Sequence, residues 1–240
     1  PKPIPGNDKY CLGSMGIYAF NPKNLLEQLN QDSEKTRTSD QLLLNKQPEK
    51  YTQNDFGKDI IPNMLRQGKE IYVYDFMQNR VRGSSERERG YWRDVGNLDA
   101  YFEANMELTI PDPILNLSNK NWPLLTYVDP KVPIHSKTLE GGASLDSIIC
   151  PGVIISRSHV EKSVMGPDVY VDHGARVTES VLLGSSVIGK GSMIYRTIID
   201  KDVIVPDNTS IGFDDKNSAE ANGFTMSEKG ITIVPKGYKF

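Results

Sequence analysis

Cysteine is scarce in this sequence of 240 residues: only Cys11 and Cys150 occur, far apart and without a CxxC spacing. Such a pair argues against a disulfide-dense scaffold and against a thiolate metal site. A reducing compartment suits a chain that uses so little cysteine, so we expect the protein in the cytoplasm.

Long apolar runs and an excess of one charge are also absent. No stretch approaches the roughly 20 apolar residues of a membrane span, and the first eight residues are polar and proline-rich, unlike an export signal. With 28 basic and 31 acidic residues, the formal net charge of -3 creates no field that attracts nucleic acid or an anionic membrane. We therefore expect neither as a partner.

A glycine-rich phosphate loop is missing as well. Neither G-x-G-x-x-G nor a Walker sequence occurs, so the chain has no visible backbone nest for a triphosphate. The sequence opens with a proline-rich loop that leads directly into an apolar run without a partner strand nearby. This opening indicates a chain cut from something longer.

Strand-like and helix-like patterns alternate in the first hundred residues, which is typical of α/β domains. Residues 12–20 (LGSMGIYAF) and 70–76 (EIYVYDF) carry the β-branched and aromatic types of strands. Helices are predicted from Asn21 onward, over 55–68 (DFGKDIIPNMLRQG) and over 98–108. The polar segment 30–54 is interpreted as an insertion.

The second half of the chain repeats itself after a proline-rich segment. Rows beginning at Ser147, Ser163, Ser180 and Thr197 stack equivalent residues with steps of 16, 17 and 17. Three aliphatic columns result: Ile148, Val164, Val181 and Ile198; Val153, Val169, Val187 and Val203; Val160, Val177, Ile194 and Ile211. We predict that all three columns point into a coil with three flat faces.

An antiparallel β-sandwich with short strands is the alternative to this solenoid, and the regular step argues against it. The final stretch SEKGITIV, at 227–234, predicts a last strand that covers the open end of the coil.

Five short motifs, GSMGIYAF, DFGKDIIP, YWRDVG, NWPLLTY and SEKGITIV, occur in the order and context of bacterial glucose-1-phosphate adenylyltransferases (ADP-glucose pyrophosphorylases). The chain resembles that family over nearly its whole length, and the motifs are specific when taken together. The resemblance implies that residues 1–110 are the C-terminal portion of an α/β, Rossmann-like nucleotidyltransferase domain. A linker at 111–143 and a left-handed parallel β-helix of hexapeptide-type repeats at 144–240 would follow.

The activity that the resemblance implies is formation of ADP-glucose and diphosphate from ATP and glucose 1-phosphate in glycogen biosynthesis, by a regulated homotetramer. Because the family's triphosphate loop does not occur in this sequence, we expect the chain alone to be inactive.

The resemblance also assigns site residues. Asp94 in YWRDVG would be catalytic and bind Mg²⁺ together with a second aspartate from outside this chain. Ser14 would hydrogen-bond glucose 1-phosphate. The remaining residues expected to line the sugar pocket are Tyr18, Asp55, Phe56 and Trp92.

Residue types alone leave simpler roles open. Asp94 and Asp55 each precede a predicted helix and can cap it. Ser14 can occupy a strand bend, and single aromatic residues more often belong to a core than to a pocket wall.

Further family positions are matched less closely. Lys2 precedes a proline, as does a family lysine that contacts the sugar phosphate, but Pro1 stands where the family has glutamate. Lys190 and Arg196 lie where family members bind anionic sugar-phosphate regulators, although exposed cations on a solenoid are usually a solvated face. Leu125 in NWPLLTY replaces a common arginine, so regulation is expected to differ.

Two other functions remain open. A hexapeptide-repeat acyltransferase needs a histidine base, and His135, His159 and His173 lie in or just before the repeats, but the first half of the chain would then go unexplained. A non-catalytic regulatory subunit would keep the fold without the chemistry, and the presence of Ser14, Asp55 and Asp94 argues against it.

Overall fold

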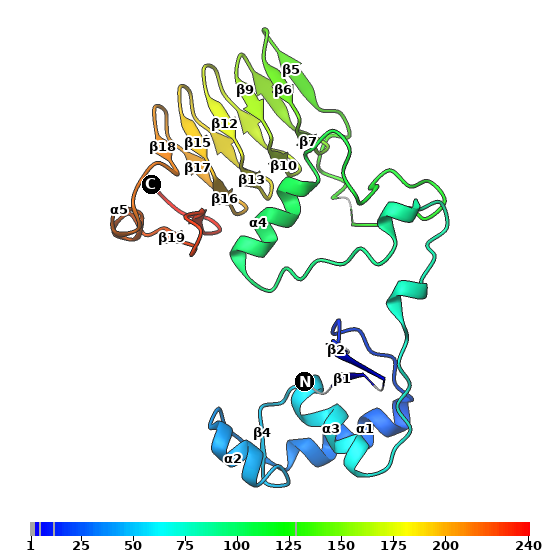
Figure 1. Ribbon diagram of the computed structural model, residues 1–240. Coiled ribbons are helices and arrows are strands. Elements are labelled where there is room, and N and C mark those ends of the chain that lie inside the picture. Colours follow the sequence, from blue (N-terminus) through cyan, green and yellow to red (C-terminus); the bar gives the residue numbers. More distant parts are fainter. Residues whose placement is uncertain (1–2, 5, 12, 128) are drawn as a thin grey trace. The chain divides into compact units, whose positions relative to one another are not determined.

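The computed structural model describes residues 3–4, 6–11, 13–127 and 129–240, which form two compact units, Pro1–Tyr74 and Asp75–Phe240. Each unit is described by itself (Figure 1). Within the described residues, no helix combines the length and the apolar character needed to span a bilayer.

Short helices dominate the first unit, and the strands among its described residues form two small pairs. The helical elements are α1 (Pro22–Ser33), α2 (Gln41–Lys46), the π-helical turn η1 (Phe56–Ile60) and α3 (Ile61–Arg66). The strands are β1 (Pro3–Ile4) and β2 (Asn7–Cys11), paired antiparallel, and β3 (Thr36–Arg37) and β4 (Tyr51–Thr52), paired parallel.

The helix expected from Asn21 is confirmed as α1, which Asn21 caps by accepting from the Lys23 amide. The strands expected at 12–20 and 70–76 are wrong for the described residues, which are irregular there except for a turn beginning at Phe76. No described strand pairs with either segment. A strand-like pattern produces a strand only when a neighbour supplies backbone hydrogen bonds, and neither segment has one here.

Asp32, which is buried at the end of α1, holds the end of the polar segment 30–54 against that helix. Its carboxylate accepts from the Thr52 hydroxyl at 2.8 Å and from the Asn54 side chain at 3.3 Å, and it pairs with Lys35 at 3.2 Å. These bonds join β4 to α1, so the chain returns to a defined place just before Asp55.

The second unit begins with two single-turn 3-10 helices, η2 (Phe76–Gln78) and η3 (Glu86–Glu88), followed by α4 (Leu98–Glu107). The coil that follows alternates between three parallel sheets (Figure 1). Its strands are β5 (Lys137–Leu139), β6 (Ala143–Leu145), β7 (Ile148–Ile149), β8 (Ile154–Ser156), β9 (His159–Glu161), β10 (Val164–Met165), β11 (Tyr170–Val171), β12 (Arg176–Thr178), β13 (Val181–Leu182), β14 (Val187–Ile188), β15 (Met193–Tyr195), β16 (Thr197–Ile199), β17 (Ile204–Val205) and β18 (Ser210–Ile211).

The predicted solenoid is confirmed, and the β-sandwich alternative does not apply, because each strand pairs in parallel with the equivalent strand of the next coil. The ladders begin at β5, inside the segment expected as a linker, since Lys137 pairs with Ile154 of β8. The third aliphatic column is correct: Val160, Val177, Ile194 and Ile211 are in register, buried, and part of the central core.

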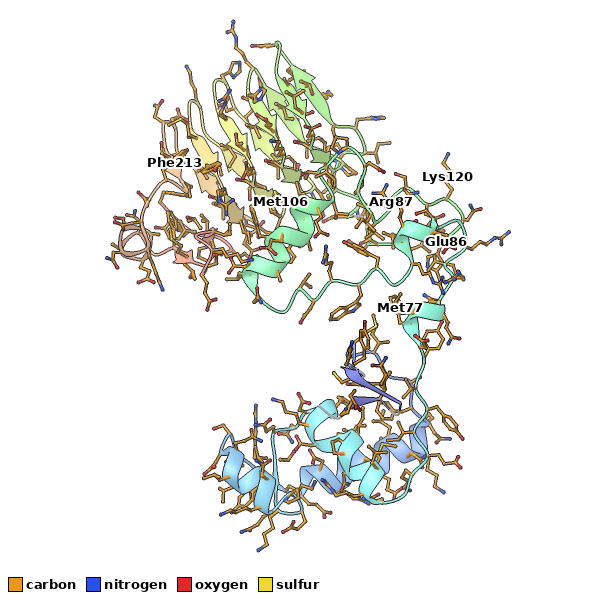
Figure 2. All side chains as sticks on the ribbon, viewed as in Figure 1. Met77, Glu86, Arg87, Met106, Lys120 and Phe213 are labelled. Atoms are coloured by element: carbon orange, nitrogen blue, oxygen red, sulfur yellow. The ribbon has the colours of Figure 1, made fainter. Side chains whose placement is uncertain are left out.

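The first aliphatic column does not point inward as predicted. Its members are in register, but the interior residues of these strands are their neighbours, such as Met165, Leu182 and Ile199. Val181 and Ile198 instead form a second cluster with Phe102 of α4, which lies along this face of the coil (Figure 1). Met106 of α4 packs against the same cluster (Figure 2).

This face of the coil is apolar on both sides because a helix covers its outer surface. The sequence pattern therefore cannot tell which of two adjacent aliphatic residues points into the coil.

The second column contains a slip of one residue. Val153, Val169 and Val203 are buried in the core, but Val187 pairs with Tyr170 and Ile204 and is only half-buried. Ser186 takes the equivalent buried position, and its hydroxyl donates to the Gly184 carbonyl at 3.0 Å. A serine can replace valine at this buried position because its hydroxyl is hydrogen-bonded to a backbone carbonyl of the same corner.

Hydroxyl groups form a ladder along one corner of the coil, at the residues that begin the repeat rows. Ser147 accepts from the Ser163 amide at 3.1 Å, Ser163 from the Ser180 amide at 3.1 Å, and Ser180 from the Thr197 amide at 3.2 Å. Each of these hydroxyls also donates to a carbonyl two residues earlier. The ladder therefore satisfies corner backbone groups that the strand ladders cannot reach.

The last strand and its role at the end of the coil are confirmed. Strand β20 (Thr232–Val234) pairs parallel with β16 and antiparallel with β19 (Thr225–Met226). Helix α5 (Lys216–Ala221) precedes them, and its buried Ala219 joins the core together with Phe224. Tyr238 and Phe240 pack their rings on Phe224, so aromatic side chains close this end.

Gly189→Ala is expected to destabilise the coil. A Cβ at this position would lie 2.6 Å from both the Pro206 carbonyl carbon and the Val205 oxygen of the next coil, neither of which can move. We expect a loss of about 3 kcal/mol in the free energy of unfolding, measured by urea denaturation. Gly141→Ala is the control: it has a positive φ of 77° but an open neighbourhood, and should lose only about 1 kcal/mol. Equal losses would contradict the steric explanation.

Phe102→Ala tests the helix cover. Phe102 is 4% exposed and contacts the outward column, so truncation should lower the free energy of unfolding by about 3–5 kcal/mol in the same assay. Phe213→Ala removes a ring of the same kind that is 58% exposed, and should cost under roughly 1 kcal/mol. A small loss at residue 102 would show that α4 is not needed for coil stability.

Candidate functional site

Three aromatic rings and a hydroxyl pair gather in the first unit. The Ser14 hydroxyl and the Tyr18 hydroxyl are hydrogen-bonded at 2.7 Å, and the Gly16 amide donates to Ser14 at 3.1 Å. The Tyr18 ring stacks on Phe56 with centroids 6.0 Å apart, and Phe20 contacts both rings at 6.1 and 5.5 Å. Phe56 nevertheless remains 38% exposed, so its ring offers surface to a ligand.

Asp55 begins the π-helical turn beside these rings. Its carboxylate accepts from the Lys58 amide at 2.8 Å, as expected of a cap, and its own amide donates to the buried Asp59 carboxylate at 3.0 Å. π-Helical turns often occur at functional sites because they add a residue to the helix and displace its side chains. Capping therefore holds Asp55 in place while it remains half-exposed.

Gly57 shows that Asp55 and Tyr18 face a common space. A Cβ at Gly57 would lie 3.4 Å from Asp55 Oδ1 and 3.6 Å from the Tyr18 hydroxyl. The structure thus brings Ser14, Tyr18, Asp55 and Phe56 together from two segments about forty residues apart. A carboxylate, two hydroxyls and an aromatic face form a surface suited to a polyhydroxylated ligand.

The other two predicted residues, Trp92 and Asp94, belong to the second unit. Their neighbours anchor the segment: Tyr91 donates to Glu107 of α4 at 3.2 Å, and the Arg93 Nε donates to the same oxygen at 2.9 Å. Burial and the nearby Glu107 carboxylate raise the pKa of Tyr91. Trp92, at 43% exposure, and Asp94 are left exposed.

Asp94 does not cap the helix that follows it. Asn97 does so, by accepting from the Ala100 amide at 2.8 Å, while Asp94 Oδ1 accepts from the Gly96 amide at 3.0 Å. Its other oxygen has no partner among the described residues. An exposed carboxylate of this kind fits Mg²⁺ as the one ligand from this chain, because this ion takes one or two carboxylates and most of its other ligands from water and phosphate. The described residues contain no group of three metal-ligating side chains.

The two cations considered for regulation lie on either side of β15, at different corners of the coil. Lys190 is exposed. Arg196 already has partners, because its guanidinium pairs with Glu179 at 3.5 Å and lies 5.8 Å from the centre of the Phe102 ring. Lys2 lies outside the described residues.

His173 is engaged by two carboxylates, which bears on the acyltransferase alternative. Its Nδ1 lies 2.6 Å from Asp172, and its Nε2 lies 3.0 Å from Glu140 at the corner between β5 and β6. These hydrogen bonds raise the pKa of His173, chiefly through Asp172, and lower the pKa of Asp172. Because a carboxylate occupies each ring nitrogen, neither nitrogen is free to take a proton from a substrate, so His173 is a poor candidate for a general base.

Comparison with known proteins places both halves of the chain. Residues 5–110 match the nucleotidyl transferase family, and residues 130–234 match the GlmU-like C-terminal hexapeptide family. Glucose-1-phosphate adenylyltransferase of Parafrankia sp. is 39% identical over 99% of this chain and 54% of its own length. The enzyme of that name from Arthrobacter sp. is 41% identical over 94% of this chain and 46% of its own length.

This chain is similar to part of the glucose-1-phosphate adenylyltransferases from these organisms. It spans about half the length of the curated relatives it matches. The two matches give a nucleotidyl transferase segment followed by a hexapeptide segment, and the parallel ladders agree with the predicted left-handed β-helix.

Sequence reasoning missed the residues that hold the site. Phe20 completes the ring cluster, Asp59 binds the Asp55 amide, and Glu107 anchors YWRDVG. The spacing of Asp55 and Asp59 was a usable signal, because residues four apart in a helical segment lie on one face. Glu107 carried no such signal, since its partners are fourteen and sixteen residues away.

The His173 contacts predict a pH dependence. The folded pKa lies above the ordinary value of 6.5, so the added stability is fully present below that unfolded value and is lost as pH rises through the folded pKa. We expect an NMR titration to give a raised pKa for His173, and Glu140→Gln to lower it. The matched control Glu228→Gln, at an exposed site on the last segment, should leave it unchanged. A pKa insensitive to Glu140→Gln would contradict the contact.

Proposed function

We propose that this chain is part of a glucose-1-phosphate adenylyltransferase, which joins ATP and glucose 1-phosphate into ADP-glucose and diphosphate for glycogen biosynthesis. The chain contributes the sugar-phosphate side of the site. The observation that carries the proposal is the gathering of Ser14, Tyr18, Asp55 and Phe56 around one space, in a chain similar to enzymes of that name along almost its full length.

Each member of this cluster has a chemical role toward glucose 1-phosphate. The exposed Phe56 ring packs on the C–H face of the hexose, and Asp55 accepts hydrogen bonds from sugar hydroxyls. Ser14 and Tyr18 are both donors and acceptors, and their mutual bond orients them before the ligand arrives. Trp92 adds a further exposed aromatic surface.

The reaction requires a phosphate oxygen of the sugar to attack the α-phosphorus of ATP in line, with diphosphate leaving. A bound Mg²⁺ would neutralise the charge that develops on the phosphates. Asp94 is the residue of this chain that would hold the ion, and the Tyr91–Arg93–Glu107 contacts fix its segment. No triphosphate loop occurs in the sequence, so ATP binding and turnover require residues beyond those present here.

Regulation and assembly form part of the proposal. The β-helix presents rigid flat faces, which suit self-association, and we propose a homotetramer in the cytoplasm. Lys190 is the better candidate for an anionic regulator, because Glu179 and Phe102 already occupy Arg196.

Binding of glucose 1-phosphate to the chain tests the sugar site directly. Tyr18→Phe keeps the ring stack but removes a hydroxyl, and Asp55→Asn keeps a capping residue but removes the charge. We expect each to raise the dissociation constant about tenfold, measured by calorimetry or NMR titration. Asp40→Asn is the matched control, because Asp40 caps α2 in the same manner away from the ring cluster. Equal affinity in all variants would refute this pocket.

Catalysis is tested by adding a nucleotide-binding half taken from a relative and measuring ADP-glucose formation. The reconstituted enzyme should be active and depend on Mg²⁺, and Asp94→Asn should reduce turnover while leaving glucose 1-phosphate binding intact. A folded complex that binds the sugar phosphate but forms no ADP-glucose would instead indicate a non-catalytic regulatory subunit.

A further inference from the structure

A hollow in the first unit is lined by none of the residues assigned to the sugar site. It measures about 330 Å³, within the range of small-molecule sites. We call it the α2–α3 pocket, because its wall comes from α2 and the loop after it, from η1, and from the end of α3. It is lined by Gln41, Leu44, Asn45, Pro48, Gln53, Lys58, Asp59 and Arg66.

Two cations that line this pocket have no ion-pair partner within the described part of the chain. Lys58 and Arg66 both line it, and neither forms an ion pair with any residue in the described part of the chain. Lys69, only three residues beyond Arg66, is by contrast paired with Glu27 at 3.1 Å. Lysine, as a point charge, and arginine, with its planar guanidinium, are the usual protein groups for a phosphate, and both line this hollow.

The third charged group of the pocket is a buried carboxylate. Asp59 is 8% exposed, and its Oδ2 accepts from the Gln53 and Asp55 amides at 3.0 Å each. Two backbone donors hold this carboxylate in place, so it cannot swing out to neutralise Lys58 or Arg66. A ligand that reaches it must present a hydrogen-bond donor.

Amide side chains supply the remaining polar surface. Gln41 donates to Asn45 at 3.3 Å across one turn of α2, and Gln53, which precedes η1, also lines the pocket. Such groups both donate and accept, as sugar or polyol hydroxyls require, whereas Leu44 and Pro48 provide limited apolar contact.

We propose that the α2–α3 pocket binds a small hydroxylated phosphate ester, separately from the sugar site. Lys58 and Arg66 take the phosphate, while Asp59 and the amides take the hydroxyls. The Asp59 carboxylate also holds the Asp55 amide at 3.0 Å, so an occupant that contacts Asp59 influences the position of Asp55.

The test uses the whole 240-residue chain and a matched pair of probes. Glycerol 3-phosphate carries both a phosphate and hydroxyls, and methyl phosphate carries the phosphate alone. Titration followed by amide NMR should place both at Asn45, Lys58 and Arg66, with glycerol 3-phosphate bound about tenfold more tightly. Arg66→Gln should weaken both probes about tenfold, with Lys50→Gln as the control for an exposed cation outside the pocket.

Several outcomes would overturn the proposal. Equal weakening by Arg66→Gln and Lys50→Gln would show diffuse binding to surface cations. Equal affinity for the two probes would show that the pocket does not bind the hydroxyl groups. Tyr18→Phe separates this proposal from the sugar site. The variant should weaken the binding of glucose 1-phosphate, but the NMR shift changes that glycerol 3-phosphate causes at Arg66 should stay the same.

Discussion

In-register stacking of equivalent strands is the constraint on which the second unit depends. The backbone groups of each coil form hydrogen bonds with the coils above and below it. Every corner must therefore occur at the same place in successive coils. Stacked hydroxyls meet that requirement at one corner, and glycine meets it where two backbones touch. Helix α4 packs on the rigid outer face that results, and Glu107 of this helix in turn anchors the YWRDVG segment.

The first unit achieves order by different means. Its strands are only two to five residues long, and side-chain bonds to the backbone carry much of the organisation. Asp32 ties β4 to α1, and Asp59 ties the Gln53 and Asp55 amides to η1. A buried carboxylate oxygen that accepts two hydrogen bonds specifies one arrangement, because any alternative leaves that charge without these partners. Asp55 and the ring cluster are positioned by this polar framework.

Several features were open to prediction from the sequence, and the failures share a cause. The repeat step, the third column, α1 and the last strand followed from local pattern. The first column failed because Val181 and Leu182 are both buried, one under a helix and one in the core. The strands at 12–20 and 70–76 failed because hydrogen-bonding partners, not residue types, decide whether an extended segment becomes a strand.

The sequence by itself determined the solenoid, through the spacing of its branched residues, and it determined the motifs that relate the chain to nucleotidyl transferases. Tertiary structure alone decided which side of each coil face is interior and which residues meet in space. Ser14, Tyr18 and Phe56 share a cluster, and Arg66 joins Lys58 in a separate pocket. Periodicity reports burial along one element, whereas a site depends on contacts between distant segments, which only the folded chain brings together.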